Sequence, residues 1–137
     1  MTIFRRKVLP SNLQGPFENF ERVLAEVERA KEALTEVMPT TRMPGRPVPE
    51  ALAEFEERLA RAREAMPGWR RGETETEWTA CRSGVDESLS RARRLREDAP
   101  DLAGFEGLIW AVEQLLDPLE PFRSAATRFR SLRVPAR

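Results

Sequence analysis

The chain has 137 residues, of which 40% are hydrophobic and 34% are charged. This length suits one domain with a core of its own, and the composition is typical of charge-rich helical proteins. The formal net charge is zero, which argues against a uniformly basic nucleic-acid coat or a uniformly acidic mimic of nucleic acid.

Charge is distributed unevenly along the chain. Residues 1–10 carry three basic residues and no acid, and residues 121–137 carry five arginines and no acid. The 110 residues between these two segments must therefore sum to −8. Basic ends on an acidic body are the strongest charge pattern in the sequence.

We predict an extended N-terminal arm over residues 1–15, a single helical domain over 16–132 and a basic tail over 133–137. The arm has no clear hydrophobic period. The first helix is expected from Pro16 to Met38, because apolar residues there recur at spacings of three and four. A proline-rich connection leads to a second helix from Pro49 to Met66, which begins with a favourable first-turn proline.

A third helix is predicted from the sequence Thr74 to Asp98, because Thr74 and Glu77 have the spacing of a capping box. Cys81 falls on its apolar face and is expected to be a buried core residue. Gly84 should cost this helix about 1 kcal/mol relative to alanine unless a neighbouring backbone packs close to it.

The last predicted helix is the longest and runs from Leu102 to Leu132. Its apolar residues follow gaps that alternate between three and four, namely Phe105, Leu108, Val112, Leu115, Leu119, Phe122, Ala126 and Phe129. Pro118 and Pro121 predict a kink near Asp117. The expected fold is all-α, a four-helix up-down antiparallel bundle with a long, proline-kinked C-terminal helix that extends beyond its neighbours.

The residue types argue against catalysis. The sequence contains no histidine and no tyrosine, which removes the usual general base and the commonest metal ligand. The acidic run from Glu73 to Glu77 suits the start of a helix as well as it suits a cation. We therefore expect no enzyme activity, no cofactor or metal, and no small-molecule substrate.

The location is expected to be cytoplasmic. A single cysteine excludes an intramolecular disulfide and favours a reducing compartment. No apolar run approaches the roughly 20 residues of a membrane helix, and the first residues lack the apolar centre of a signal peptide.

Two tryptophans stand out as candidate protein-interface residues. Trp110 points away from the apolar stripe of the last helix, so it either lies beneath the N-terminal arm or anchors a partner. Trp69, between charged neighbours in the second loop, has the same two interpretations. Phe122 and Phe129 join them as interface candidates, although their spacing favours a place in the core.

The leading functional prediction is a non-catalytic helical interaction protein, a small subunit or adaptor of a larger assembly, with a protein partner or self-association. The alternative is a nucleic-acid-binding accessory subunit whose basic ends contact phosphates. Its candidate contacts lie in the arm and in the last helix: Arg5, Arg6, Lys7, Arg123, Arg128, Arg130 and Arg133. Docking of the two basic ends on an anionic membrane is a third, weaker hypothesis.

Overall fold

The structure, a computed structural model, describes residues 6–98 and 104–136. The long helices are α1 (Ser11–Thr35), α2 (Val48–Ala65), α3 (Glu75–Asp98), α4 (Gly104–Leu116) and α5 (Pro121–Ser131). Short elements complete the fold: strands β1 (Lys7–Val8) and β2 (Val134–Pro135), and 3-10 helices η1 (Met66–Trp69), η2 (Gly72–Thr74) and η3 (Asp117–Leu119). The predicted helix start at Leu102 and the candidate contact Arg5 lie outside the described residues.

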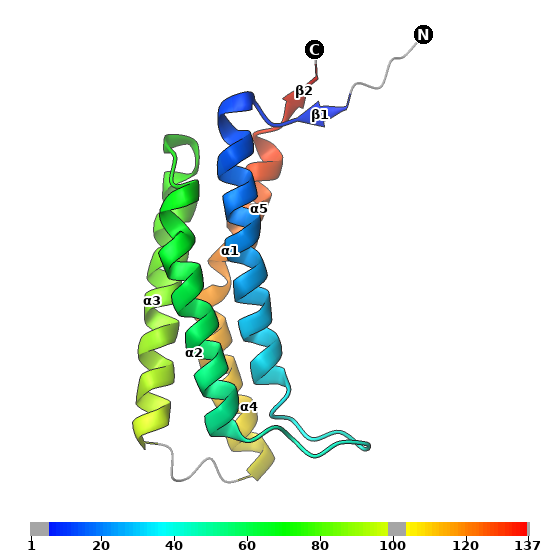
Figure 1. Ribbon diagram of the computed structural model, residues 1–137, viewed down its shortest axis with the longest axis vertical. Coiled ribbons are helices and arrows are strands. Elements are labelled where there is room, and N and C mark those ends of the chain that lie inside the picture. The colour runs from blue at the N-terminus through cyan, green and yellow to red at the C-terminus, as the bar shows by residue number, and fades with distance from the viewer. Residues whose placement is uncertain (1–5, 99–103, 137) are drawn as a thin grey trace.

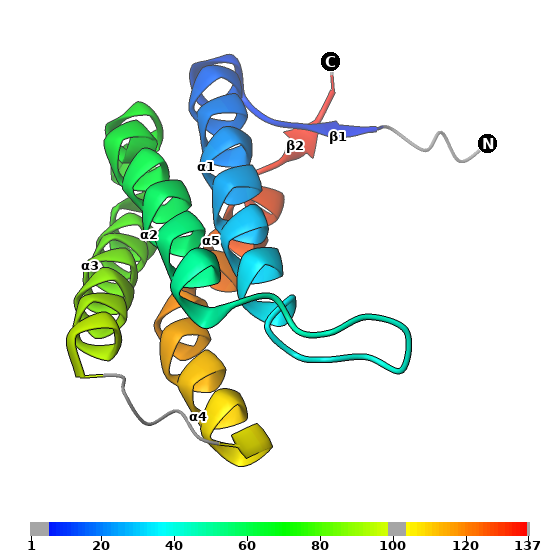
Figure 2. The same ribbon diagram turned by 60° about the horizontal axis from the view of Figure 1, so that its bottom comes forward.

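The helices form an up-down antiparallel bundle (Figures 1 and 2). α1, α2 and α3 alternate in direction, and α4, η3 and α5 follow one another end to end as the fourth rod of the bundle (Figure 1). The all-α four-helix prediction is confirmed. The fourth rod runs alongside the other three (Figure 1). Its helix is interrupted at Asp117–Leu119, where the two prolines predicted a kink.

The first helix begins at Ser11, five residues before the predicted start at Pro16. The reason is burial, because Leu9 and Leu13 are only 7% and 2% exposed and lengthen the apolar stripe of α1 by one turn. Pro16 sits inside the helix and is itself buried. Residues 11–15 of the predicted arm are therefore part of α1, and β1 is the one element before α1 among the described residues.

The two ends of the described chain pair with each other, which the sequence did not predict. β1 and β2 are antiparallel, with Lys7 opposite Pro135 and Val8 opposite Val134. The Ala136 amide extends the ladder by donating to the Arg6 carbonyl at 2.9 Å. This ribbon lies at the end of the bundle that holds the start of α1 and the end of α5 (Figure 1).

The core is continuous and contains predicted apolar residues from each of the four rods. Cys81 is fully buried within it, as predicted, and burial raises the pKa of its thiol to about 12. Ion pairs link neighbouring rods at the edges of the core, with Arg58 of α2 3.3 Å from Glu26 of α1 and Arg96 of α3 2.8 Å from Glu56 of α2. Such surface pairs contribute little stability and mainly fix helix register.

The start of α3 differs from the predicted capping box. Thr74 is buried, and its hydroxyl donates to the carbonyls of Trp69 at 3.3 Å and Arg71 at 3.4 Å. The hydroxyl therefore ties the turn together instead of capping the helix amides. η1 and η2 form a tight turn before α3, and this turn brings the Trp69 and Arg71 carbonyls within reach of the Thr74 hydroxyl.

Candidate interaction surface

Side chains of α3 hold the fourth rod in place by replacing backbone hydrogen bonds that are lost at its proline-containing break. Pro118 has no N–H, so the Gln114 carbonyl lacks its usual partner four residues later. Arg91 of α3 replaces that partner by donating to the Gln114 carbonyl at 2.8 Å. Ser88, one of two fully buried polar residues described, donates to the neighbouring carbonyl of Leu115. Two side chains of α3 thus satisfy the carbonyls that the break exposes.

Gly84 allows the rods to approach closely at the same level. A side-chain carbon at Gly84 would overlap the carbonyl oxygen of Pro118. The sequence analysis expected Gly84 to cost stability unless a neighbouring backbone packed close to it, and the Pro118 carbonyl is such a neighbour. Together with Ser88 and Arg91, Gly84 fixes the rotation of α4 about its axis, and hence which side chains face outward.

Trp110 faces outward from α4, as predicted, and is 55% exposed. Glu106, Glu113 and Asp117 are exposed beside it on the same side of the rod. Residues three and four apart share one side of a helix, so these four side chains form one stripe, which we call the α4 outer face. Its centre is a large amphipathic side chain, and its border is acidic.

The described part of the N-terminal arm does not cover Trp110. β1 pairs with β2 at the end of the bundle where α5 finishes, whereas α4 lies toward the opposite end (Figure 1). Residues 6–15 of the predicted arm therefore do not cover Trp110, and residues 1–5 lie outside the described part of the chain.

Trp69 belongs to the core, so its assignment as an exposed interface residue is corrected. It is fully buried, with its ring edge-on to Phe20 at a centroid distance of 5.0 Å. The 3-10 turn η1 folds it back across the end of the bundle, and the Trp78 indole N–H holds that turn by donating to the Met66 carbonyl at 2.8 Å. Arg70 covers the outside, 4.1 Å above the Trp78 ring.

Phe122 and Phe129 are also core residues, each 1% exposed. Phe129 lies 5.0 Å from Phe20 and 5.3 Å from Phe17 between ring centroids, and Phe122 packs against Phe20 at 6.5 Å. Neither ring is available to stack on a base or to anchor a partner. The three-four spacing that favoured a core position was the better guide.

The predicted nucleic-acid contacts fall into two groups. Arg6 and Lys7 of the N-terminal end and Arg130 and Arg133 of the C-terminal end are exposed, and the β1–β2 pairing places the two ends together. The guanidinium of Arg133 lies 5.7 Å above the Phe17 ring.

The other two arginines have acidic or carbonyl partners within the chain. Arg128 donates to the Glu73 carbonyl at 2.9 Å and lies 3.8 Å from the Glu77 carboxylate. Arg123 is 84% exposed at its side chain, with Glu120 3.9 Å away. Arg128 therefore helps to fasten α5 to the start of α3, whereas Arg123 remains accessible.

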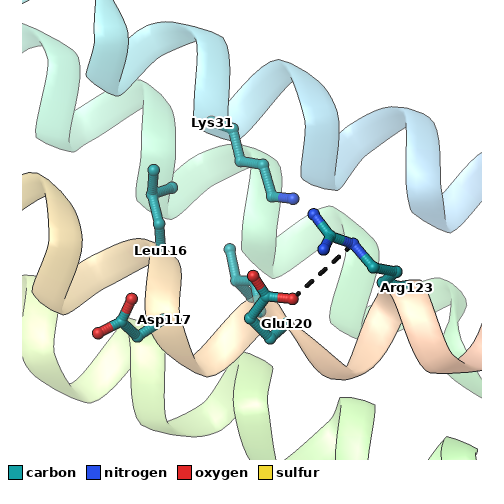
Figure 3. Close-up of a pocket in the computed structure, with 6 residues that line it drawn as sticks. Lys31, Leu116, Asp117, Glu120 and Arg123 are labelled. Atoms are coloured by element: carbon teal, nitrogen blue, oxygen red, sulfur yellow. Dashed lines mark ion pairs between the residues drawn. The ribbon is translucent and has the colours of Figure 1, made fainter.

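A small charged pocket of about 170 Å³ lies between α1 and the break in the fourth rod (Figure 3). The charged ends of Lys31 and Arg123 point toward each other across it, with Glu120 beside Arg123 and Asp117 at the rim (Figure 3). Lys31 is also 3.4 Å from Glu28. Two cations and two carboxylates among the lining residues cancel, so the pocket offers no net attraction to an anion.

Charge divides the fourth rod into two halves. From Gly104 to Glu120 it carries four acids and no basic residue, and from Pro121 to Arg133 it carries four arginines and no acid. The sequence-based charge count found the basic half as the arginine-rich C-terminal end of the chain. The acidic half could have been found in the same way, by counting along the last predicted helix.

Within the described residues no group of three or more histidine, cysteine, aspartate or glutamate side chains is placed to hold a metal ion. No helix in residues 6–98 and 104–136 has the length and hydropathy needed to cross a membrane. The fold and its surface thus define a four-helix bundle with an exposed tryptophan on a charge-divided rod. No protein-family model matches the chain, and neither does any curated protein or solved structure.

Proposed function

We propose that this chain is a non-catalytic helical interaction protein, a small subunit or adaptor that binds a protein partner through the α4 outer face. The exposed Trp110 carries the proposal, because tryptophan is among the residues that most often anchor protein interfaces. The proposal places the protein in the cytoplasm, a reducing setting that the lone, buried Cys81 favours.

The surroundings of Trp110 support this choice. The side chains of Glu106 and Glu113 border it, and a polar rim around an aromatic centre is the usual composition of a non-obligate interface. The contacts of Gly84, Ser88 and Arg91 with the break hold α4 in one orientation. A preset surface of this kind binds without first paying the entropy of ordering a loop.

The test is site-specific photo-crosslinking from position 110. A benzophenone amino acid replaces Trp110 in the full chain, and the same probe at Arg29, an exposed position on α1, serves as the matched control. We expect a covalent protein adduct from position 110 in the native cell extract and none from position 29. A chain that forms no adduct from position 110, in the extract or with itself, contradicts the proposal.

A second candidate function, binding of nucleic acid by the basic end, is favoured by the β1–β2 pairing. That pairing gathers Arg6 and Lys7 with Arg133, although the sequence separates them by more than a hundred residues. Such a cluster would contact phosphates and bind with strong salt dependence.

Fluorescence anisotropy with labelled single- and double-stranded DNA and RNA tests this second candidate. Reversing Lys7 and Arg130 to glutamate should abolish binding, whereas reversing Arg22 and Arg29 changes the net charge equally and should weaken it much less. Absence of binding by the native chain at low salt rules this candidate out.

A further inference from the structure

We infer that the partner of the α4 outer face is a second copy of this chain, whose fourth rod lies antiparallel along the fourth rod of the first. This inference rests on the proposed function and names its partner. It follows from the charge division of the rod, from the side chains on its two halves and from the symmetry that an antiparallel pair of copies would have.

The charge division supplies the orientation. The half from Gly104 to Glu120 has a formal charge of −4, and the half from Pro121 to Arg133 has +4. Two copies side by side in the same direction would place acid against acid and arginine against arginine. Turned end for end, each acidic half faces a basic half, so electrostatic complementarity selects the antiparallel arrangement.

The side chains on the two outer faces are also complementary in size. The α4 outer face is centred on the large Trp110, whereas α5 exposes the small side chains of Ser124, Thr127 and Ser131. The hydroxyls of Thr127 and Ser131 donate to carbonyls of their own helix, at 3.1 and 2.7 Å. Their donors are thus satisfied before contact, and covering them with an indole ring removes less hydrogen bonding to water.

The arginines of α5 stand on either side of this strip of small residues. Arg123 and Arg130 are exposed on one side of it and Arg128 is half-buried on the other. In an antiparallel pair Arg123 and Arg130 would meet the border of the α4 outer face, where Glu106, Glu113 and Asp117 are exposed, whereas Arg128 keeps its contacts with the start of α3 in its own chain. An arginine brought near Trp110 would gain a cation–π contact as well.

The arrangement is closed, and its contact area is that of a weak interface. A two-fold axis through η3 relates the two rods, so the same contacts occur twice and no surface is left to add a third copy. A rod from Gly104 to Ser131 is about 40 Å long, at roughly 1.5 Å per residue. A strip of that length and the roughly 10–12 Å width of one helix covers about 400–500 Å² on each copy, an area at the low end of the range for specific interfaces.

The test is a charge exchange measured by sedimentation equilibrium. One variant carries Glu106→Arg and Glu113→Arg, and the other carries Arg123→Glu and Arg130→Glu. Each alone should associate at least about tenfold more weakly than the native chain, because like charges now face each other. An equimolar mixture should regain a species of about twice the 15.7 kDa chain mass, since a rod of net charge +4 then meets a rod of net charge −4.

The matched control reverses Glu18 and Glu64, which are exposed on α1 and α2 and change the net charge as much as the first variant does. This control should associate like the native chain. Circular dichroism establishes that each variant is helical. If a variant is not helical, a photo-crosslinker at Thr127 of the otherwise native chain is used in its place. This probe should label residues 106–114 of the second copy.

The outcomes separate this inference from the proposed function. A monomeric native chain whose probe at position 110 captures a different protein overturns the second-copy inference and leaves the proposed function standing. A native dimer whose charge-exchanged mixture stays monomeric also overturns it, because the exchanged faces then do not pair with each other. A native dimer whose two variants each still dimerise alone overturns it as well, because the dimer then uses another surface. A monomer with no adduct from position 110 overturns both.

Discussion

Trp69 and Trp110 look alike in the sequence and differ completely in the structure. Both have polar or charged residues nearby and neither fits an apolar stripe, yet Trp69 is fully buried and Trp110 is 55% exposed. The difference lies in the backbone around each. Trp110 is inside a regular helix, where position along the chain fixes direction, whereas Trp69 ends a 3-10 turn whose path is set by tertiary contacts.

The largest expected effect is at the buried tryptophan. Trp69→Ala should lower the free energy of unfolding by about 3–5 kcal/mol, the usual cost of removing a buried large aromatic. The ring fills the space between Phe20 and Phe129, at centroid distances of 5.0 and 6.0 Å, so its loss leaves a cavity. Urea denaturation followed by circular dichroism measures the change, and a loss below about 1 kcal/mol would mean that Trp69 is not a core residue.

The next effect concerns the contact that sets which way Trp110 faces. Gly84→Ala should destabilise the protein by about 1–3 kcal/mol, although alanine is the better helix former, because its methyl group would overlap the Pro118 carbonyl oxygen. Gly72→Ala is the matched control, since a side-chain carbon there has no described atom within 4 Å. A stabilising Gly84→Ala, measured by the same denaturation, would show that α3 and the break do not pack closely.

A smaller, pH-dependent effect is expected at the rim of the Trp69 turn. Arg70 donates to both carboxylate oxygens of Glu75, at 2.7 and 3.1 Å for the closest contacts, and these hydrogen bonds hold the pKa of Glu75 below its ordinary value. A lowered folded-state pKa adds stability that is present above the unfolded pKa and disappears as pH falls through the folded one.

The native chain should therefore be slightly more stable than Glu75→Gln near neutral pH. This advantage should shrink as the pH falls below about 4.3, the ordinary glutamate pKa. Thermal denaturation of both proteins over that pH range measures it. An advantage that stays constant with pH would show that the charge of Glu75 does not contribute.

The smallest effect on stability is expected at the exposed tryptophan. Trp110→Ala should change the unfolding free energy of the monomer by no more than about 0.5 kcal/mol, because the side chain is largely in solvent. The measurement is made at a protein concentration where the chain is monomeric, so that any loss of association does not enter. A loss comparable to that of Trp69→Ala would remove the contrast between the two residues and, with it, the basis for an interface at α4.

The sequence predicted the bundle well and the candidate surface in part. Helical spacing identified all four rods, the break at the two prolines and the outward direction of Trp110. It also favoured core positions for Phe122 and Phe129, although these stood among the interface candidates. The prediction from helical spacing was wrong at Trp69 and at the start of α1. A turn determines the position of Trp69, and the burial of Leu9 and Leu13 determines where α1 begins.

What the sequence by itself determined is the order and type of the helices and the opposite charges of the two halves of the last one. These depend on residue spacing and on counts along the chain, which are local properties. Only the tertiary structure decided that β1 joins β2, that Ser88 and Arg91 satisfy the carbonyls freed by Pro118, and that Trp69 closes the core. Each of these contacts joins elements distant in sequence, and such contacts depend on how the rods pack against one another.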